Sequence, residues 1–263
     1  MSGGESSVAP GVPAGDAPVL AGRTALVTGA GRGIGRAIGI ALARAGASVT
    51  LVARTHADLQ DVAAEIRANG GAASPIVLDV TDESAVRAAI RELPTHDILV
   101  NAAGTNRPEP IREVDIRTLD ALMAVNVRAT FIVTQAVVSR LLDESRTGVV
   151  INISSQMGHV GAANRSVYCM TKHAVEGLTK ALGVELAPHG IRVVSIAPTF
   201  IDTPLTRPFF ADPQFRADVL ASIPLGRLGQ PEEVAAAAVF LASPQAALIT
   251  GSSLLLDGGW TAR

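Results

Sequence analysis

The octapeptide Thr28-Gly-Ala-Gly-Arg-Gly-Ile-Gly35 lies between two segments of different hydrophobic pattern. Residues 24–27 before it form a short apolar run of strand-forming residues, and after it apolar side chains recur at helical spacing as far as Ala45. Gly46 ends this helix, and residues 48–53 form the next apolar run. A strand, a glycine loop, a helix and a second strand make the opening unit of a dinucleotide-binding α/β fold.

The loop glycines have the spacing T-G-x-x-x-G-x-G, which differs from G-x-G-x-x-G in every register. Glycines let the backbone approach a pyrophosphate, which then lies at the positive end of the following helix. A plain glycine turn is the alternative, but the strand before the loop and the helix after it favour a nucleotide site. The residues expected to bind the cofactor here are Thr28, Gly29, Gly31, Arg32, Gly33, Ile34 and Gly35.

The end of the second strand indicates which cofactor to expect. Sites that prefer NAD usually carry Asp or Glu at this point for the ribose hydroxyls. This chain has Ala53 and Arg54 instead, and Arg32 lies inside the glycine loop. An acid would repel a 2′-phosphate, whereas two guanidiniums can bind it through charge-assisted hydrogen bonds. We therefore expect NADP(H) in preference to NAD(H).

A second signal lies in the segment Ser166-Val-Tyr-Cys-Met-Thr-Lys172. Its tyrosine, Tyr168, follows Ser155 by thirteen residues. Residues four apart on a helix share a face, so the ammonium of Lys172 can approach the phenol of Tyr168. A nearby cation favours the phenolate and lowers the pKa of a tyrosine from its usual value of about 10. Such a pair can exchange protons at neutral pH. The alternative is a tyrosine packed beside a surface lysine.

Together these residues resemble the short-chain dehydrogenase/reductase family in its single-domain form, from about Arg23 to Arg263. Further motifs follow in the order of that family: Leu78-Asp79-Val80, Asn101-Ala-Ala-Gly104, Val125-Asn126-Val127 and Asp257-Gly-Gly259. Two positions depart from its pattern. Ala102 replaces the second Asn of N-N-A-G, and Thr199 stands where the family often has a glycine beside the nicotinamide.

The resemblance implies hydride transfer between the nicotinamide and a carbonyl or carbinol carbon, with Asn126, Ser155, Tyr168 and Lys172 as the catalytic residues. Tyr168 would exchange a proton with the substrate oxygen. Lys172 would lower the pKa of Tyr168 and hold the nicotinamide ribose. Ser155 would donate to the oxygen as negative charge develops, and Asn126 would orient a water. The resemblance also implies cofactor contacts from Asp79 at the adenine, from Thr203 at the carboxamide, and from Val80, Asn101, Ala102, Gly104, Pro198 and Ile201.

The remaining chain alternates alanine-rich helical segments with Val/Ile/Leu runs, most of them apolar throughout, as in parallel strands buried on both faces. The strands are expected at residues 24–28, 48–53, 73–78, 98–101, 149–153, 192–197 and 253–256. The predicted fold is α/β, a single doubly wound Rossmann-type domain with a seven-stranded parallel sheet over residues 21–263. Residues 1–20 are rich in Gly, Ser, Pro and Ala and predict a disordered N-terminal extension, not a signal peptide.

Composition argues against several other classes of protein. A net charge of −2 offers no broad basic surface for nucleic acid, and no apolar run approaches the roughly 18 to 20 residues that cross a bilayer. The single cysteine, Cys169, is read as a packing residue, and no Cys, His and Asp cluster has metal-site spacing. We expect a cytoplasmic enzyme with no metal, nucleic-acid or membrane partner. The resemblance implies a homotetramer or homodimer, with interfaces at the helices around Asn126 and Tyr168 and at the strand before Trp260.

The segment 198–224 holds four of the six phenylalanines, at positions 200, 209, 210 and 215. In the family the corresponding stretch is a substrate loop, and we expect it to act as a lid that excludes water. The alternative is that these rings pack against a neighbouring subunit.

Substrate contacts are expected from Ser155, Gln156, His159 and Tyr168, with Met157 and Asn164 on the same stretch. His159 is a candidate second acid or a wall of the pocket. Arg107 and Arg207 are candidates for a substrate carboxylate or phosphate, or are simply solvated.

Gln156-Met-Gly-His159 and Asn106-Arg107 make the chain similar to sugar and sugar-acid dehydrogenases of the family, such as gluconate 5-dehydrogenase-like enzymes. The expected substrate is a small sugar acid, polyol or related ketone. One alternative is a 3-oxoacyl-carrier-protein reductase, which would need a basic patch for its acidic carrier, with Arg107, Arg128 and Arg207 as candidates. Another is a non-catalytic NADP-binding regulatory protein.

Overall fold

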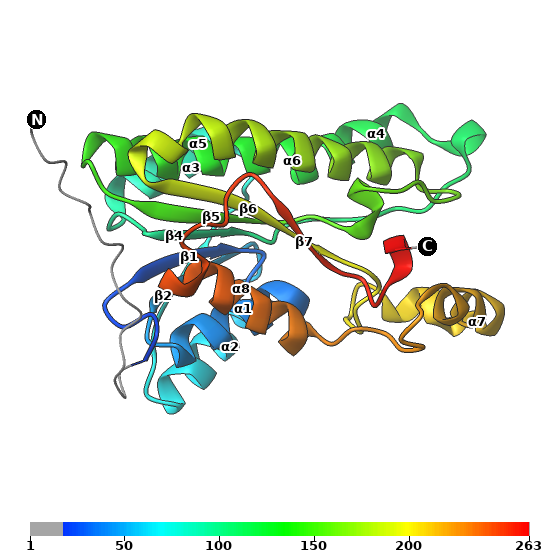
Figure 1. The fold of residues 1–263 in the computed structure, drawn as a ribbon, viewed down its shortest axis with the longest axis horizontal. Helices are drawn as coiled ribbons and strands as arrows, with labels where there is room; N and C mark the ends of the chain where they lie inside the picture. Colours follow the sequence, from blue (N-terminus) through cyan, green and yellow to red (C-terminus); the bar gives the residue numbers. More distant parts are fainter. Residues whose placement is uncertain (1–17, 263) are drawn as a thin grey trace, which may run out of the picture.

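The computed structural model describes residues 18–262, in which seven parallel strands form one sheet in the order β3-β2-β1-β4-β5-β6-β7 (Figure 1). The strands are β1 (Thr24–Thr28), β2 (Ser48–Ala53), β3 (Ala72–Val77), β4 (Ile98–Asn101), β5 (Gly148–Ile153), β6 (Ile191–Pro198) and β7 (Ser253–Leu256). The predicted fold class is confirmed, and each strand lies within one residue of its expected position.

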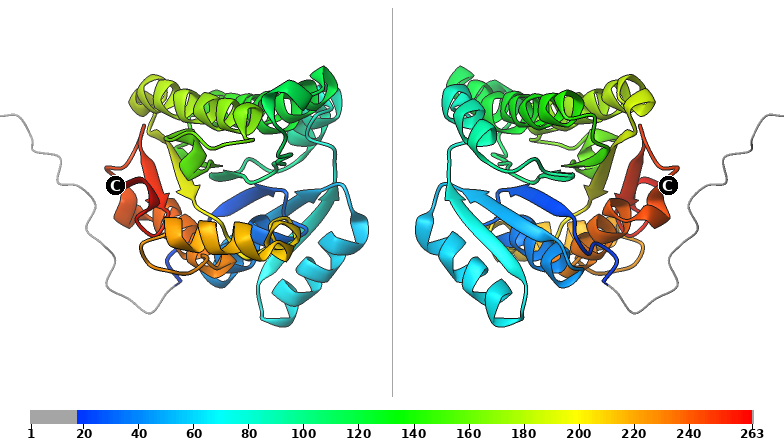
Figure 2. Two further views of the ribbon diagram at one scale, coloured as in Figure 1. Left: turned by 90° about the vertical axis from the view of Figure 1, so that its right-hand side faces the viewer. Right: turned by 90° about the vertical axis from the view of Figure 1, so that its left-hand side faces the viewer.

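Helices cover both faces of the sheet and give the domain three layers (Figure 2). One face carries α1 (Gly33–Arg44), α2 (His56–Ala68) and α8 (Pro231–Ala242), and the other carries α3 (Glu83–Glu92), α4 (Ile116–Met123), α5 (Ala129–Asp143) and α6 (Ser166–Glu185). The short helix α7 (Pro213–Ser222) lies apart from both layers, near the C-terminus (Figure 1).

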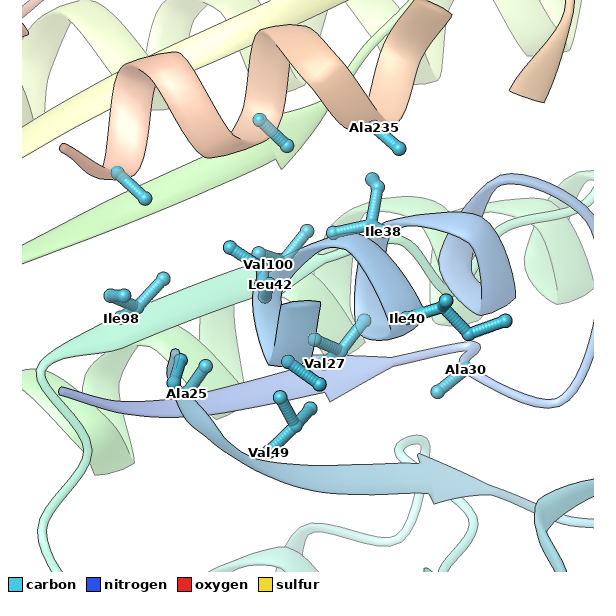
Figure 3. Packing of buried hydrophobic residues seen from close by; sticks show 14 of the residues in the cluster. Ala25, Val27, Ala30, Ile38, Ile40, Leu42, Val49, Ile98, Val100 and Ala235 are labelled. Carbon is cyan, nitrogen blue, oxygen red and sulfur yellow. The ribbon is translucent and has the colours of Figure 1, made fainter. Parts of the chain in front are cut away.

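The core beneath α1 shows how the first βαβ unit is held against the sheet. Ile38 and Leu42 are fully buried on one face of α1, and Figure 3 shows Ile38 beside Ala235 of α8. Val27 of β1 and Val100 of β4 lie in the same cluster. Small alanines on α8 let the two helices approach closely, so the start of α1 is fixed firmly above the sheet.

The sheet changes winding direction between β1 and β4, because β2 and β3 extend from one side of this pair and β5 to β7 from the other. Parallel sheets of this kind bind ligands in the crevice at the carboxyl ends of the strands beside such a point. The register aligns Thr28 with Asn101 and Asn101 with Asn152. The glycine loop, the Asn101–Gly104 segment and Ser155 therefore leave the sheet at the same edge.

A five-residue π-helical turn, Ala124–Arg128, joins α4 to α5 and carries Asn126. The resulting helix, Ile116–Asp143, is the one helix of the described residues that is long and apolar enough to span a membrane. More than half of its most apolar window is buried inside the protein, and α5 packs on the sheet. These features are those of a core helix, and a single such helix is weak support for a membrane span.

Residues 18–20, which the prediction assigns to the N-terminal extension, are described by the structure and lie against the domain. Leu20 is buried in the first core and its N–H donates to the carbonyl of Ala45 at 2.8 Å. The rest of the predicted extension, residues 1–17, lies outside the described residues.

Candidate active site

A cavity of about 130 Å³ opens at the carboxyl edge of the sheet, and most of its walls come from predicted residues. The predicted residues that line it are Ile34, Ala102, Gly104, Ser155, Tyr168, Lys172, Pro198, Ile201 and Thr203. Sequence reasoning did not assign Thr105, Ile153, Ser154, Leu205 and Thr206, which also line it. Each of these neighbours a predicted residue or lies in the substrate loop, so proximity to a motif was the available signal.

Steric limits fix the glycine loop. A Cβ on Gly29 would lie 2.8 Å from the amide nitrogen of Ala103, and one on Gly35 would lie 2.7 Å from the carbonyl carbon of Gly29. Gly29 also has φ of +67°, which favours glycine. The loop is therefore folded tightly against the Asn101–Gly104 segment and leaves its N–H groups at the start of α1 for an anion.

The hydroxyl of Thr28 ties the glycine loop to the end of β4. It accepts hydrogen bonds from the amides of Ala102 at 3.1 Å and Ala103 at 3.2 Å. Its role in the fold is thus to hold the two loops that form the floor of the site together.

The start of the substrate loop lies over the glycine loop. A Cβ on Gly33 would lie 3.5 Å from the Thr203 Cγ2 atom, and the Thr203 N–H donates to the hydroxyl of Thr206 at 3.0 Å. Ile201 forms an isolated β-bridge with Gly229. The loop is thereby anchored at one end beside the expected cofactor path.

Two exposed arginines lie at the corner expected to receive a 2′-phosphate. The side chains of Arg32 and Arg54 have no hydrogen bond or ion pair with another described residue, and Arg54 is close enough to Asp79 to help lower the pKa of that carboxylate. Hydrogen bonds from Thr81 are the larger cause of the Asp79 shift. An acid that sequence reasoning missed, Asp58, lies against the loop, with its Cβ 3.0 Å from the position of a Cβ on Gly31.

Ser155, Tyr168 and Lys172 meet at one side of the cavity. Ser155 follows β5 and its Oγ donates to Gln156 Oε1 at 3.0 Å, while α6 carries the other two residues on one face. Lys172 Nζ lies 5.6 Å from the centre of the Tyr168 ring and donates to the Ile153 carbonyl at 2.9 Å. The Ser155 hydroxyl is also close enough to Tyr168 to oppose the rise in the pKa of that phenol.

The expectation of a lowered Tyr168 pKa is wrong, because the pKa of this phenol is raised. Burial raises the pKa of Tyr168 to about 12, against the opposing effects of the Ser155 hydrogen bond and the Arg165 charge. Burial likewise lowers the pKa of Lys172 to about 8, although Glu176 opposes this shift. Both groups line the same cavity, and loss of water is the largest cause of each shift.

Asn126 is almost fully buried, and its side-chain amide holds Thr105 and Thr171 together through hydrogen bonds. Its Oδ1 accepts from the Thr105 amide at 2.9 Å, while its Nδ2 donates to the Thr105 carbonyl at 2.9 Å and to the Thr171 hydroxyl at 3.1 Å. Both amide hydrogens are thereby used within the fold. The side chain fixes the loop after Gly104, and the water-orienting role stays a prediction.

Two predicted cofactor residues have side chains committed to the interior. Asn101 donates to Thr134 and Asn152, both at 2.9 Å, and so joins β4, β5 and α5. Val80 is buried in the core beneath α3 and α5. Neither side chain lines the cavity, so cofactor contact by either residue stays a prediction.

The predicted substrate residues divide into two groups. Gln156 is buried beside Ser155 and its Nε2 has no partner among the described residues. The structure does not bring His159 into the cavity, because its Nε2 lies 3.0 Å from Ser253 Oγ and 3.4 Å from Glu176 Oε1. Its role as a second acid at the reacting oxygen is therefore unsupported by the geometry.

The candidate anion-binding arginines already have carboxylate partners. Arg107 pairs with Glu109 at 2.6 Å, Arg207 with Asp202 at 2.7 Å, and Arg128 with Glu83 at 2.6 Å. All three of these arginine side chains are more than half exposed. They do not form a free basic patch.

Three of the four loop phenylalanines pack within the chain. Phe200, Phe210 and Phe215 have ring centroids 5.7 to 6.0 Å apart, and Trp260 lies 6.0 Å from Phe200. Phe209 instead lies beneath the guanidinium of Arg165, whose carbon is 5.5 Å from the ring centroid. The structure therefore provides intrachain partners for rings that were alternatively expected at a subunit interface.

Comparison with known proteins shows the family. A family model described as Enoyl-(Acyl carrier protein) reductase, of the short-chain type, matches residues 29–261. The chain belongs to the short-chain dehydrogenase/reductase family. It is 42% identical to L-xylulose reductase of Bos taurus over 92% of this chain and 98% of that protein.

Other family members extend the similarity to bacterial enzymes. The chain is 40% identical to D-threitol dehydrogenase of Mycolicibacterium smegmatis, over 92% of this chain and 94% of that protein. A crystal structure of gluconate 5-dehydrogenase from Burkholderia cenocepacia in complex with NADP and tartrate is 36% identical, with a TM-score of 0.90 over 94% of this chain and 98% of that one. The family assignment predicted from the motifs is thus confirmed.

Proposed function

We propose that this protein is an NADP(H)-dependent oxidoreductase that interconverts a carbonyl and a secondary alcohol on a small sugar acid, polyol or related ketone. The observation that carries the proposal is the convergence of Ser155, Tyr168 and Lys172 on one cavity that the glycine-loop residue Ile34 also lines. The activities named for the xylulose, threitol and gluconate relatives support the same substrate class.

The residues present fit a dinucleotide. Gly29 and Gly35 leave a backbone cradle that a Cβ would fill, and the exposed, unpaired Arg32 and Arg54 supply charge for a 2′-phosphate. Such a cofactor, when bound, supplies or accepts the hydride. NADP(H) is proposed over NAD(H) on the arginines and on the bound NADP named for a related structure.

The protein's own residues position the substrate and move the proton. Ser155 has a rotatable hydroxyl at the cavity wall and can donate to a substrate oxygen as negative charge develops. Tyr168, protonated below its pKa of about 12, gives its proton to that oxygen during reduction. Oxidation needs the reverse transfer, from the substrate hydroxyl to the phenolate of Tyr168. A cation close to the phenol favours this transfer because it stabilises the phenolate.

The two alternatives lack the features they need. A carrier-protein reductase requires free basic side chains at the mouth, but Arg107, Arg128 and Arg207 are each ion-paired. A regulatory protein would have no need of Ser155, Tyr168 and Lys172 in one cavity. We therefore favour the enzyme.

The test is NADPH oxidation by the purified protein with 5-keto-D-gluconate, L-xylulose, diacetyl and acetoacetyl-coenzyme A. Turnover of the keto-sugars well above the thioester is expected. Preference for the thioester would replace the proposed substrate class with an acyl chain. If none of the four compounds were turned over, the proposal that the protein is an oxidoreductase would be refuted.

We also propose a homotetramer, with a homodimer as the alternative. Apolar side chains are exposed on two separate faces, at β7 and the loops near it (Leu225, Leu248, Leu254 and Leu255) and on α5 and α6 (Phe131, Met170 and Val184). Strand β7 also ends the sheet with an unpaired edge. Light scattering should give four chains per particle, and a monomer would refute both forms.

The proposed location is the cytoplasm. A lone cysteine that cannot form an intrachain disulfide fits a reducing compartment, and cell fractionation would test the location.

A further inference from the structure

Arg165, at the residue before α6, is a buried cation without a counter-ion. It is 7% exposed, and no carboxylate of residues 18–262 forms an ion pair with it. Within the described residues its side chain forms one hydrogen bond, from Nη1 to the Asn164 carbonyl at 3.3 Å, and its Nε is buried without an acceptor. An unpaired charge is costly to bury, so buried guanidiniums are normally matched by an anion.

We propose that Arg165 binds the carboxylate of the substrate, so that the preferred substrate is a sugar acid and not a neutral ketose. This inference rests on the proposed function and names the substrate class within it.

The position of Arg165 fits this role. It lies three residues before Tyr168, and its charge acts on the phenol. Its guanidinium stacks over Phe209, in the loop that also contributes Thr203, Leu205 and Thr206 to the cavity. The cation is thus held between the helix that carries the catalytic tyrosine and the loop that covers the site.

The carboxylates of Glu109 and Asp202 pair with other arginines and not with Arg165, and one Glu109 oxygen, Oε2, is buried without a partner. Glu109 pairs with Arg107, and its backbone N–H donates to the same Asn164 carbonyl that accepts from Arg165. Asp202 pairs with Arg207. A carboxylate brought by the substrate would match the Arg165 charge, because an arginine fork binds a carboxylate through two parallel hydrogen bonds.

Several buried polar atoms without partners belong to residues that line the cavity or lie next to its lining. Ser154 and Thr199 line the cavity. Gln156 accepts a hydrogen bond from the lining residue Ser155, and Asn106 directly follows the lining residue Thr105. The atoms concerned are Ser154 Oγ, Thr199 Oγ1, Gln156 Nε2 and Asn106 Oδ1. Buried polar groups are normally hydrogen-bonded, and a molecule with several hydroxyls and a carboxylate would supply both donors and acceptors.

The test compares two substrates that differ in one group: 5-keto-D-gluconate and L-sorbose, in which CH₂OH replaces the carboxylate. The wild type should prefer the keto acid. Arg165→Met keeps the apolar length of the side chain and should lower kcat/KM for the keto acid about 10- to 100-fold, mainly through KM. The value for L-sorbose should change less than about threefold. Arg165→Lys should restore part of the loss.

Arg207→Gln and Arg107→Gln are the matched controls, and neither should alter the ratio of the two substrates. If either control removes the preference and Arg165→Met does not, the carboxylate site lies elsewhere and the inference is overturned. Equal turnover of both substrates by the wild type overturns the inference while the proposed function stands. Turnover of neither substrate overturns the inference, and the proposed function falls with it unless L-xylulose or diacetyl is reduced.

A measurement on the wild type alone covers the case in which Arg165→Met fails to fold. D-gluconate and D-glucitol differ by the same carboxylate, and their inhibition constants against L-sorbose reduction are compared. D-gluconate should bind at least about tenfold more tightly. Equal constants would contradict a carboxylate site.

Discussion

The cofactor end and the substrate end of this cavity are built differently. At the cofactor end the backbone sets the shape: Gly29 and Gly35 permit contacts that no side chain could enter, and Thr28 joins the two loops through its hydroxyl. At the substrate end side chains set the shape, and several of them, including Gln156 and Arg165, bury polar atoms that have no partner.

The difference teaches how one fold serves many substrates. A backbone cradle recognises pyrophosphate in the same way whatever the surrounding side chains are. The substrate end is instead a set of exchangeable side chains, whose unmatched donors and charges are stabilised when a suitable molecule binds. We expect changes at the two ends to separate cofactor affinity from substrate selectivity.

The largest effect is expected where the two ends meet. Tyr168→Phe removes the hydroxyl that exchanges the proton and should lower kcat by about 10²- to 10⁴-fold. The NADPH dissociation constant, measured by fluorescence titration, should change less than about threefold, because the ring remains. A variant that retains wild-type turnover would show that another group moves the proton.

Gly35→Ala tests whether backbone contacts shape the cofactor end. A Cβ there would lie 2.7 Å from the Gly29 carbonyl carbon, so we expect a loss of about 1 to 3 kcal/mol in unfolding free energy and weaker NADPH binding. Gly177→Ala on α6 is the matched control, since nothing lies within 4 Å of its Cβ position. This control should be up to about 1 kcal/mol more stable than the wild type. Similar denaturation curves for the two variants would disprove the steric account.

The arginine corner, Arg32 and Arg54, sharpens the comparison, because it is a part of the cofactor end where charged side chains and not the backbone would contact the cofactor. Replacing both Arg32 and Arg54 by Ala should raise the NADPH dissociation constant about tenfold or more and leave that for NADH almost unchanged. Arg44→Ala, at the far end of α1, should change neither constant. Equal weakening for both cofactors would mean that these arginines do not read the 2′-phosphate.

The smallest expected effect is the pH dependence of chemical labelling at Lys172. The chain has two lysines, Lys172 in the cavity and the exposed Lys180. Burial lowers the pKa of Lys172 to about 8, so its uncharged amine becomes abundant as the pH rises through that value. Reductive methylation of the cofactor-free protein, followed by peptide mass spectrometry, should show Lys172 labelling rise around pH 8 relative to Lys180. A ratio independent of pH would contradict the shift.

Most of the cofactor end could be predicted from the sequence, and much of the substrate end could not. Glycine spacing is a direct consequence of backbone sterics, and the strand pattern follows from burial on both faces. The positions of Thr28, Gly29 and Gly35 were therefore readable. Motif spacing likewise identified Ser155, Tyr168 and Lys172, which the structure brings to one cavity.

The pairing of charged side chains depends on contacts that a sequence does not display. From the sequence Arg107 and Arg207 were either candidates for a substrate anion or simply solvated, and the structure shows that Glu109 and Asp202 pair with them. Arg165 carried no signal in the sequence, because only the fold shows that it is buried and unpaired. The Tyr168 pKa was mispredicted for a related reason: helical spacing gives proximity and does not give desolvation.

The most direct test of the contrast between the two ends is a crystal structure with NADP⁺ and D-gluconate bound. The account predicts that the backbone of residues 28–35 keeps its present path, while the guanidinium of Arg165 and the Nε2 of Gln156 acquire hydrogen bonds to the sugar acid. A rearranged glycine loop, with Arg165 and Gln156 still unpartnered beside the bound ligand, would contradict it.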